Sequence, residues 1–106
     1  MKNILRASIM VLALALVFSV YSFADAGADT FKAKCAACHG ATGAGDTTMG
    51  KNLKLKDLGS ADVQKQSDEE LTTIITKGKA KMPAYDGKLT KEQVSDVVKF
   101  IRSLKK

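Results

Sequence analysis

The chain has 106 residues, 26% of them charged, and a formal net charge of +6 at neutral pH. Its length suits one small domain, and a domain of this size usually needs a disulfide, a metal or a cofactor to support its core. Only two cysteines and one histidine are present, which excludes a closed zinc site with four cysteine or histidine ligands.

The first residues have the composition of a secretory signal peptide. Lys2 and Arg6 form a positively charged start, and residues 9–20 are an almost unbroken apolar run. An uncleaved membrane anchor is the alternative, but the run is short for a membrane span. We therefore expect an export signal, and with it a periplasmic protein.

Small residues at the end of this segment mark a cleavage site. The pattern predicts that the signal is cleaved after Ala24 or Ala26. We thus expect a signal peptide over residues 1–26 and one mature domain over residues 27–106. After cleavage, no stable insertion in a membrane is expected.

The mature part begins with a predicted helix over residues 29–39. This segment contains no glycine or proline, and it places Phe31, Cys35 and Cys38 on one helical face. Three glycines within residues 40–46 then favour turns and end the helix.

The middle of the chain predicts a loop followed by a capped helix. Residues 47–66 are rich in lysine, with scattered leucines and one short predicted helix at 61–65. Ser67 and Glu70 have the spacing of a capping box, and Gly78 suits the helix end. The helix between them has a one-sided apolar stripe made of Leu71, Ile74 and Ile75.

The last helix begins in a similar way. Thr90 and Gln93 form a second capping-box pattern, and Leu89 precedes the cap as a hydrophobic staple requires. Apolar residues then recur at helical spacing: Val94, Val97, Val98, Phe100, Ile101 and Leu104. No segment alternates with a period of two, so the predicted domain is all-α.

The segment Cys35-Ala36-Ala37-Cys38-His39 is the strongest indication of function. Its C-x-x-C-H spacing is typical of the attachment site of a c-type haem. Each thiol can form a thioether to the porphyrin edge. The imidazole of His39 then lies close enough to coordinate the iron.

Two other kinds of site use paired cysteines, and neither suits this chain. A closed zinc site needs four ligands, and Cys38 and His39 are adjacent, so they face one tetrahedral ion together only with difficulty. A thioredoxin-type redox pair expects a βαβ context, which the sequence lacks. A covalently attached haem is the preferred interpretation.

The second axial ligand of such a haem has to be something other than histidine. Methionine, lysine, water or an external ligand remain open, and the mature methionines are Met49 and Met82. Pro83 stiffens the loop after Met82, as a fixed thioether ligand requires, whereas Met49 lies next to flexible Gly50. Met82 is therefore the predicted ligand.

Together these segments resemble the class I c-type cytochromes, of the small bacterial monohaem kind. The resemblance rests on residues 27–39, on Met82-Pro83-Ala84-Tyr85 and on the last helix. It implies a small cytochrome c fold, with three to five helices around one covalently attached haem c.

The resemblance also implies particular contacts. Gly27 and Phe31 would pack against Val97 and Phe100 of the last helix. In many relatives a proline carbonyl after the haem motif accepts the histidine N–H, but this chain has no proline there. A backbone carbonyl in residues 40–46, or later, is expected to orient the histidine instead.

Three further side chains are expected to pack against the haem. They are Leu71, Ile75 and Tyr85.

The expected activity is one-electron transfer between redox partners, without enzymatic chemistry. A haem-based ligand sensor or weak peroxidase is one alternative, and a dedicated docking subunit of a membrane redox complex is another. We expect a monomer with no nucleic-acid partner.

Lysines suggest how redox partners are met. They either solvate a small surface or form a cationic ring that steers a partner with an acidic docking face. The lysines concerned are Lys51, Lys54, Lys56, Lys77, Lys79 and Lys81.

Overall fold

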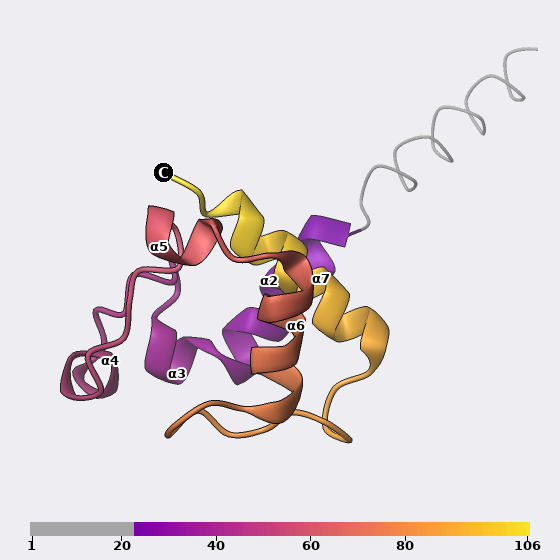
Figure 1. The fold of residues 1–106 in the computed structure, drawn as a ribbon, viewed down its shortest axis with the longest axis horizontal. Coiled ribbons are helices and arrows are strands. Elements are labelled where there is room, and N and C mark those ends of the chain that lie inside the picture. Colours follow the sequence, from indigo (N-terminus) through magenta and orange to yellow (C-terminus); the bar gives the residue numbers. More distant parts are fainter. Residues whose placement is uncertain (1–22) are drawn as a thin grey trace, which may run out of the picture.

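A computed structural model describes residues 23–106, so most of the predicted export signal, residues 1–26, lies outside the described residues. The described part forms helices and no β-strand, which confirms the all-α prediction. In chain order the helices are α2 (Phe23–Lys34), α3 (Ala36–His39), α4 (Thr48–Asn52), α5 (Ala61–Gln64), α6 (Asp68–Lys77) and α7 (Lys91–Ser103) (Figure 1).

The first and last helices, α2 and α7, cross at close range (Figure 1). A Cβ atom on Gly27 would lie 2.2 Å from the carbonyl oxygen of Asp96 and 3.2 Å from Cβ of Phe100, so only glycine permits this approach. The ring centroids of Phe31 and Phe100 are 4.9 Å apart. These contacts confirm the predicted packing of α2 on α7.

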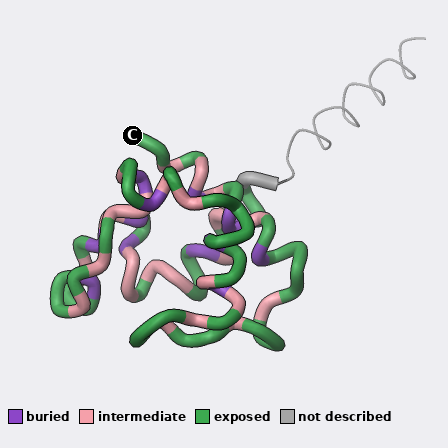
Figure 2. The backbone as a smooth tube through the Cα atoms, viewed as in Figure 1, coloured by how far each residue is buried: buried purple, intermediate pink, exposed green. Residues whose placement is uncertain are grey.

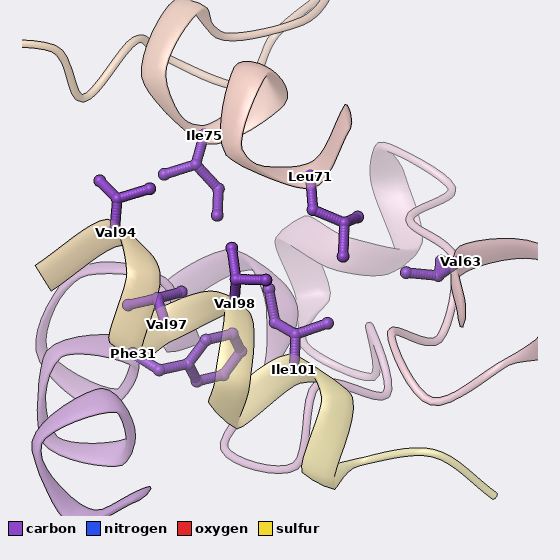
Figure 3. Close-up of a cluster of buried hydrophobic side chains, with 8 residues drawn as sticks. All are labelled: Phe31, Val63, Leu71, Ile75, Val94, Val97, Val98 and Ile101. Atoms are coloured by element: carbon purple, nitrogen blue, oxygen red, sulfur yellow. The ribbon is translucent and has the colours of Figure 1, made fainter. Parts of the chain in front are cut away.

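One hydrophobic core lies where α2, α6 and α7 meet. Figure 3 shows the α6 side chains pointing toward α7, with Val63 of α5 at one end of the cluster. Phe31 and Val97 are the most deeply buried, each with 1% of its surface exposed. The full cluster consists of Phe31, Val63, Leu71, Ile75, Val94, Val97, Val98 and Ile101.

The predicted helix over residues 29–39 is present, but in two pieces. The first piece, α2, begins before residue 29 and ends at Lys34, and α3 follows after Cys35. The amide of Cys35 still donates to the carbonyl of Phe31 at 2.8 Å, so helical hydrogen bonding continues up to the break.

The middle segment contains one helix that periodicity did not predict. This helix, α4, is capped by Thr47, whose hydroxyl oxygen accepts from the amide of Gly50 at 2.9 Å. Because α4 has five residues and buries only a glycine, it produces no apolar stripe. The short helix predicted at 61–65 is confirmed as α5.

The capping residues have the predicted roles. Ser67 accepts from the amide of Glu70 at the start of α6. In α7 both halves of the capping box form between Thr90 and Gln93. Gly78 ends α6 with a φ of +76°, a conformation that glycine adopts without strain.

The segment between α6 and α7 is largely exposed, as the green stretch below the helices in Figure 2 shows. None of the helices within residues 23–106 is long and apolar enough to cross a membrane.

Candidate functional site

Two cavities that share lining residues, called here the larger and the smaller lobe of the site, lie between α3, α6 and the segment that follows α6. The larger lobe has a volume of about 410 Å³ and the smaller one about 160 Å³. Cys35, His39 and Met82 line both lobes, and Cys38 and Tyr85 line the larger one. The fold thus brings residues 35–39 together with Met82, more than 40 positions later in the chain.

Backbone hydrogen bonds hold the segment with the two cysteines in position. The amide of His39 donates to the carbonyl of Cys35 at 3.0 Å, which closes the turn of α3. The amide of Gly45 donates to the carbonyl of His39 at 2.8 Å, and the Thr47 hydroxyl donates to the carbonyl of Cys38 at 2.6 Å. The last carbonyls of α3 are therefore satisfied by the loop that follows.

Glycine allows this loop to approach α3. Gly40 follows α3 with a φ of +83°, which turns the chain back. A Cβ on Gly50 would lie 2.7 Å from the carbonyl oxygen of Cys38 and 2.6 Å from that of Gly45. A larger residue at position 50 would push α4 away from α3.

The imidazole of His39 is suited to bind a metal ion. Burial lowers the pKa of His39 below its usual range, which favours the neutral ring, the form in which histidine coordinates metals. The ring centroid of Phe31 lies 6.2 Å from that of His39. Within residues 23–106, Nδ1 of His39 is buried and has no hydrogen-bond partner, so the expected carbonyl in residues 40–46 or later is not engaged.

The two thiols are not arranged as a redox or zinc site. Cys35 and Cys38 form no disulfide. Burial first, and the neighbouring Cys38 second, raise the pKa of the Cys35 thiol to about 11, whereas reactive redox cysteines have a lowered pKa. Residues 23–106 also bring no group of three histidine, cysteine or acidic side chains into metal-binding range.

Of the two methionines within residues 23–106, Met82 is the one that lines both lobes together with His39. Met82 is partly buried and packs against the hydrophobic core. Met49 is 50% exposed and lines neither lobe. The amide of Met82 donates to the carbonyl of Lys79 at 2.9 Å, and a return bond of 3.2 Å closes a tight turn before Pro83.

The segment that carries Met82 is built on the end of α6. Gly78 donates to the carbonyl of Ile74 at 2.8 Å, and the amide of Tyr85 donates to that of Ile75 at 3.1 Å. The amide of Asp86 donates to the carbonyl of Thr76, also at 3.1 Å. Carbonyls that a helix end leaves without partners thus hold the returning chain.

The side chains expected to pack against a haem lie on the cavity wall. Leu71 and Ile75, each 5% exposed, line the smaller lobe and also belong to the core. Tyr85 lines the larger lobe, and burial first, then Cys35 and Cys38, raise the pKa of its hydroxyl.

Several wall residues were not predicted from the sequence. Leu53 and Leu55 line the larger lobe, and Leu58 lines the smaller one. These leucines were visible as scattered apolar residues in a lysine-rich segment. Their irregular spacing reflects the end of α4 and the loop after it, which have no single repeat.

Lysines surround part of the cavity. Lys79 and Lys81 line the larger lobe as part of the expected cationic group, and Lys34 joins them without having been predicted. Lys56 lines the smaller lobe, and its Nζ lies 3.7 Å from a carboxylate oxygen of Asp62. The other three lysines of the predicted group line neither lobe: Lys51, Lys54 and Lys77.

The cavity fits a covalently attached haem. It has a mostly apolar wall, as large cofactors require, and two thiols that form no disulfide line it. The half-buried imidazole of His39 and the thioether of Met82 line the same space, and these donors are typical axial ligands of c-type haem.

Comparisons with known proteins agree with this fit. Residues 22–101 match the family described as cytochrome C oxidase, cbb3-type, subunit III. The chain is 35% identical over 109 residues to a cytochrome c6 of Picosynechococcus sp., covering 95% of this chain and 92% of that protein. It is 37% identical over 78 residues to a cytochrome c6 of Leptolyngbya boryana, covering 74% and 88%. Among solved structures, the KustC0563 c-type cytochrome is similar with a TM-score of 0.70 and 33% identity, covering 76% of this chain and 98% of that one.

Proposed function

Because the chain belongs to the small class I monohaem cytochromes c, which carry covalently attached haem c, we propose that it is an exported electron carrier with a His39/Met82-ligated haem iron. Cys35 and Cys38 form the two thioethers to the porphyrin. The observation that supports this proposal most is that Cys35, His39 and Met82 line both lobes of the site.

Each of these residues has a definite task in electron transfer. The haem supplies an iron that exchanges one electron reversibly. His39 and Met82 would hold the iron through an imidazole nitrogen and a thioether sulfur, donors that suit both oxidation states, so the bound group would supply electron transfer rather than oxygen chemistry. Leu71, Ile75 and Tyr85, which line the two lobes, would exclude water from the bound group, and such burial together with a thioether ligand would raise its reduction potential.

The proposed ligands are tested by absorption spectroscopy of the purified haem protein and of two matched variants, Met82→Leu and Met49→Leu. The wild-type protein and Met49→Leu should show the weak near-infrared-edge band of iron–thioether ligation and almost no CO binding when reduced. Met82→Leu should lose the band and bind CO. A high-spin ferric wild-type spectrum, or ready CO binding, would overturn the assignment and favour a ligand sensor or weak peroxidase.

The lysines at the larger lobe support docking to an acidic redox partner. Lys34, Lys79 and Lys81 are exposed residues that line it, so they create a positive potential beside the site of electron exchange. Such a potential raises the rate at which an anionic partner associates, and salt weakens it.

Small flavins of different charge test this field. The semiquinone of flavin mononucleotide, which carries a phosphate, should reduce the haem faster at low salt than at high salt, and neutral lumiflavin should not. Lys79→Gln with Lys81→Gln should remove most of the salt dependence. The double variant Lys91→Gln with Lys105→Gln changes the net charge by the same amount, but neither residue lines the cavity. This variant should retain the salt dependence. Equal salt dependence in both pairs would overturn the docking proposal.

Export is a separate part of the proposal. A protein with the predicted signal should be recovered from the periplasm as a monomer. The mass of the purified chain should correspond to cleavage after Ala24 or Ala26. Recovery only with membranes, at the full-length mass, would contradict export as a free carrier, and co-purification with a membrane complex would favour a docking subunit.

A further inference from the structure

The hydroxyl of Tyr85 links the two segments of the candidate haem site. It donates a hydrogen bond of 2.9 Å to the carbonyl oxygen of Lys34, 51 positions earlier in the chain. Lys34 is the last residue of α2 and directly precedes Cys35. Tyr85 lies three residues after Met82. One side chain therefore joins the cysteine segment to the methionine segment.

The Tyr85 backbone is held independently of this hydroxyl. Its amide donates to the carbonyl of Ile75 on α6, and its carbonyl accepts from the amides of Lys88 and Leu89. The ring packs against the core, and the ammonium group of Lys88 lies 5.8 Å from the ring centroid. The ring is thus anchored on the α6 side, and only the hydroxyl reaches across to α2.

The other hydrogen bonds of the turn that carries Met82 do not reach residues 34–39. Its hydrogen bonds run within the turn, between Lys79 and Met82, or back to α6. Ala80 within this turn has a φ of +54°, a left-handed conformation that is unfavourable for a residue with a Cβ. In the described part of the chain, the Tyr85–Lys34 bond is the only hydrogen bond between residues 78–89 and residues 34–39.

We propose that the Tyr85 hydroxyl is a strap: it holds the turn of residues 78–85 closed against the haem-attachment segment and so retains the Met82 thioether at the iron. This inference rests on the Met82 ligation proposed above. Tyr85 is then a positioning residue. It acts on the ligand through the backbone of its own loop and through the carbonyl of Lys34, which α2 leaves without a helical partner.

The variant Tyr85→Phe in the haem-containing protein tests the strap, because it removes the hydroxyl and keeps the ring. A single exposed hydrogen bond corresponds to roughly a threefold change in an equilibrium. Hydrogen exchange at the amides of Lys79 and Met82 should therefore become about threefold faster. Imidazole should displace the methionine from the ferric protein at about threefold lower concentration.

A matched control is Thr76→Val. Thr76 donates from its hydroxyl to the carbonyl of Thr72 at 2.7 Å, on α6 and away from Lys34. This variant also loses one exposed hydrogen bond, but it should leave exchange in the turn and the imidazole midpoint unchanged.

The possible results separate the strap from the proposed ligation. Unchanged exchange at Lys79 and Met82 in Tyr85→Phe would overturn the strap, as would equal acceleration at the Val97 amide in the core, which would indicate a general loss of stability. If the wild-type protein lacks the iron–thioether band while Tyr85→Phe still accelerates exchange in the turn alone, the strap holds the loop and the Met82 ligation is wrong.

Discussion

Gly27 faces Asp96 so closely that a Cβ atom at residue 27 would lie 2.2 Å from the Asp96 carbonyl oxygen. This contact sets the distance between α2 and α7. Since α2 leads directly into Cys35, the crossing also determines where the cysteine segment lies relative to the core.

The variant Gly27→Ala should lower the free energy of unfolding by about 2 kcal/mol, because the two helices must separate to admit the methyl group. Helix propensity alone would raise the stability by about 1 kcal/mol, so the sign of the change distinguishes the two effects. Denaturation of the haem-containing protein by guanidinium provides the measurement. Ala33→Gly, at an exposed position of the same helix, calibrates the propensity effect, and a more stable Gly27→Ala protein would contradict the close crossing.

Arg102 of α7 connects three segments of the chain. Its guanidinium donates to the carbonyl of Gln64 at 2.7 Å, to the carbonyl of Gln66, and to a carboxylate oxygen of Asp68 at 2.9 Å. Asp68 has a side chain that is 74% exposed, so its ion pair contributes little. The two carbonyls lie closer to the core and depend on Arg102 for their hydrogen bonds.

We therefore expect Arg102→Met to cost about 2 kcal/mol and Asp68→Asn less than about 1 kcal/mol of unfolding free energy. Chemical denaturation of both variants would show the difference. Lys105→Met, an exposed substitution nearby, should stay within about 0.5 kcal/mol of the wild type. Equal losses of unfolding free energy for Arg102→Met and Asp68→Asn would mean that the ion pair, rather than the carbonyl contacts, stabilises the packing of α7 on residues 64–68.

Asp57 ties the end of the described chain to the loop before α5. Its carboxylate lies 2.6 Å from Nζ of Lys106 and accepts from the amide of Gly59 at 2.8 Å. The hydrogen bond from Lys106, followed by that from Gly59, lowers the pKa of Asp57. A lowered pKa stabilises the folded state above the unfolded pKa of about 3.9.

The stability that Asp57 adds should thus be constant above about pH 4 and decline as the pH falls through its folded pKa. Thermal unfolding of the wild type and of Asp57→Asn across this range measures it: the difference between the two proteins should shrink toward acid. Asp62→Asn breaks only exposed ion pairs, at 3.6 Å and 3.7 Å, and should change stability by less than about 0.5 kcal/mol. If the difference in stability between the wild type and Asp57→Asn grew as the pH fell, the lowered pKa of Asp57 would be contradicted.

Gly78 and Ala80 both have positive φ in the turn that carries Met82, at +76° and +54°. A Cβ on Gly78 would lie 2.6 Å from the carbonyl oxygen of Met82. Gly78→Ala should therefore cost at least about 2 kcal/mol through strain and overlap. Ala80→Gly should instead raise stability by about 0.5 kcal/mol, because relief of strain slightly exceeds the entropy gained by the unfolded chain.

Both variants are measured by guanidinium denaturation, and the iron–thioether band reports on the ligand. We expect the band to weaken in Gly78→Ala and to persist in Ala80→Gly. If both substitutions change stability in the same direction, the backbone conformation of this turn does not determine how the methionine is held.

The elements that could be predicted depend on neighbours in the sequence. The caps at Ser67 and Thr90 form because each hydroxyl lies three residues before the amide it binds. The five-residue helix α4 was missed because its cap, Thr47, precedes a glycine-containing segment without an apolar repeat. The break at Cys35 was missed for a similar reason, since the helical spacing of the apolar residues continues through it.

The sequence by itself determined the chemistry of this protein: two thiols and the only histidine within five residues, and a methionine before the only proline. The order and spacing of residues along the chain determine these two motifs, because neither motif needs a contact between distant elements. The tertiary structure alone decided which side chains share the cavity: Lys34, Leu53 and Leu55 join it, and Met49 does not. It also decided that Tyr85 reaches Lys34 across 51 positions. Such contacts depend on how closely the helices cross and on which helix each loop packs against. Neither can be inferred from the type of one residue or from its spacing in the sequence.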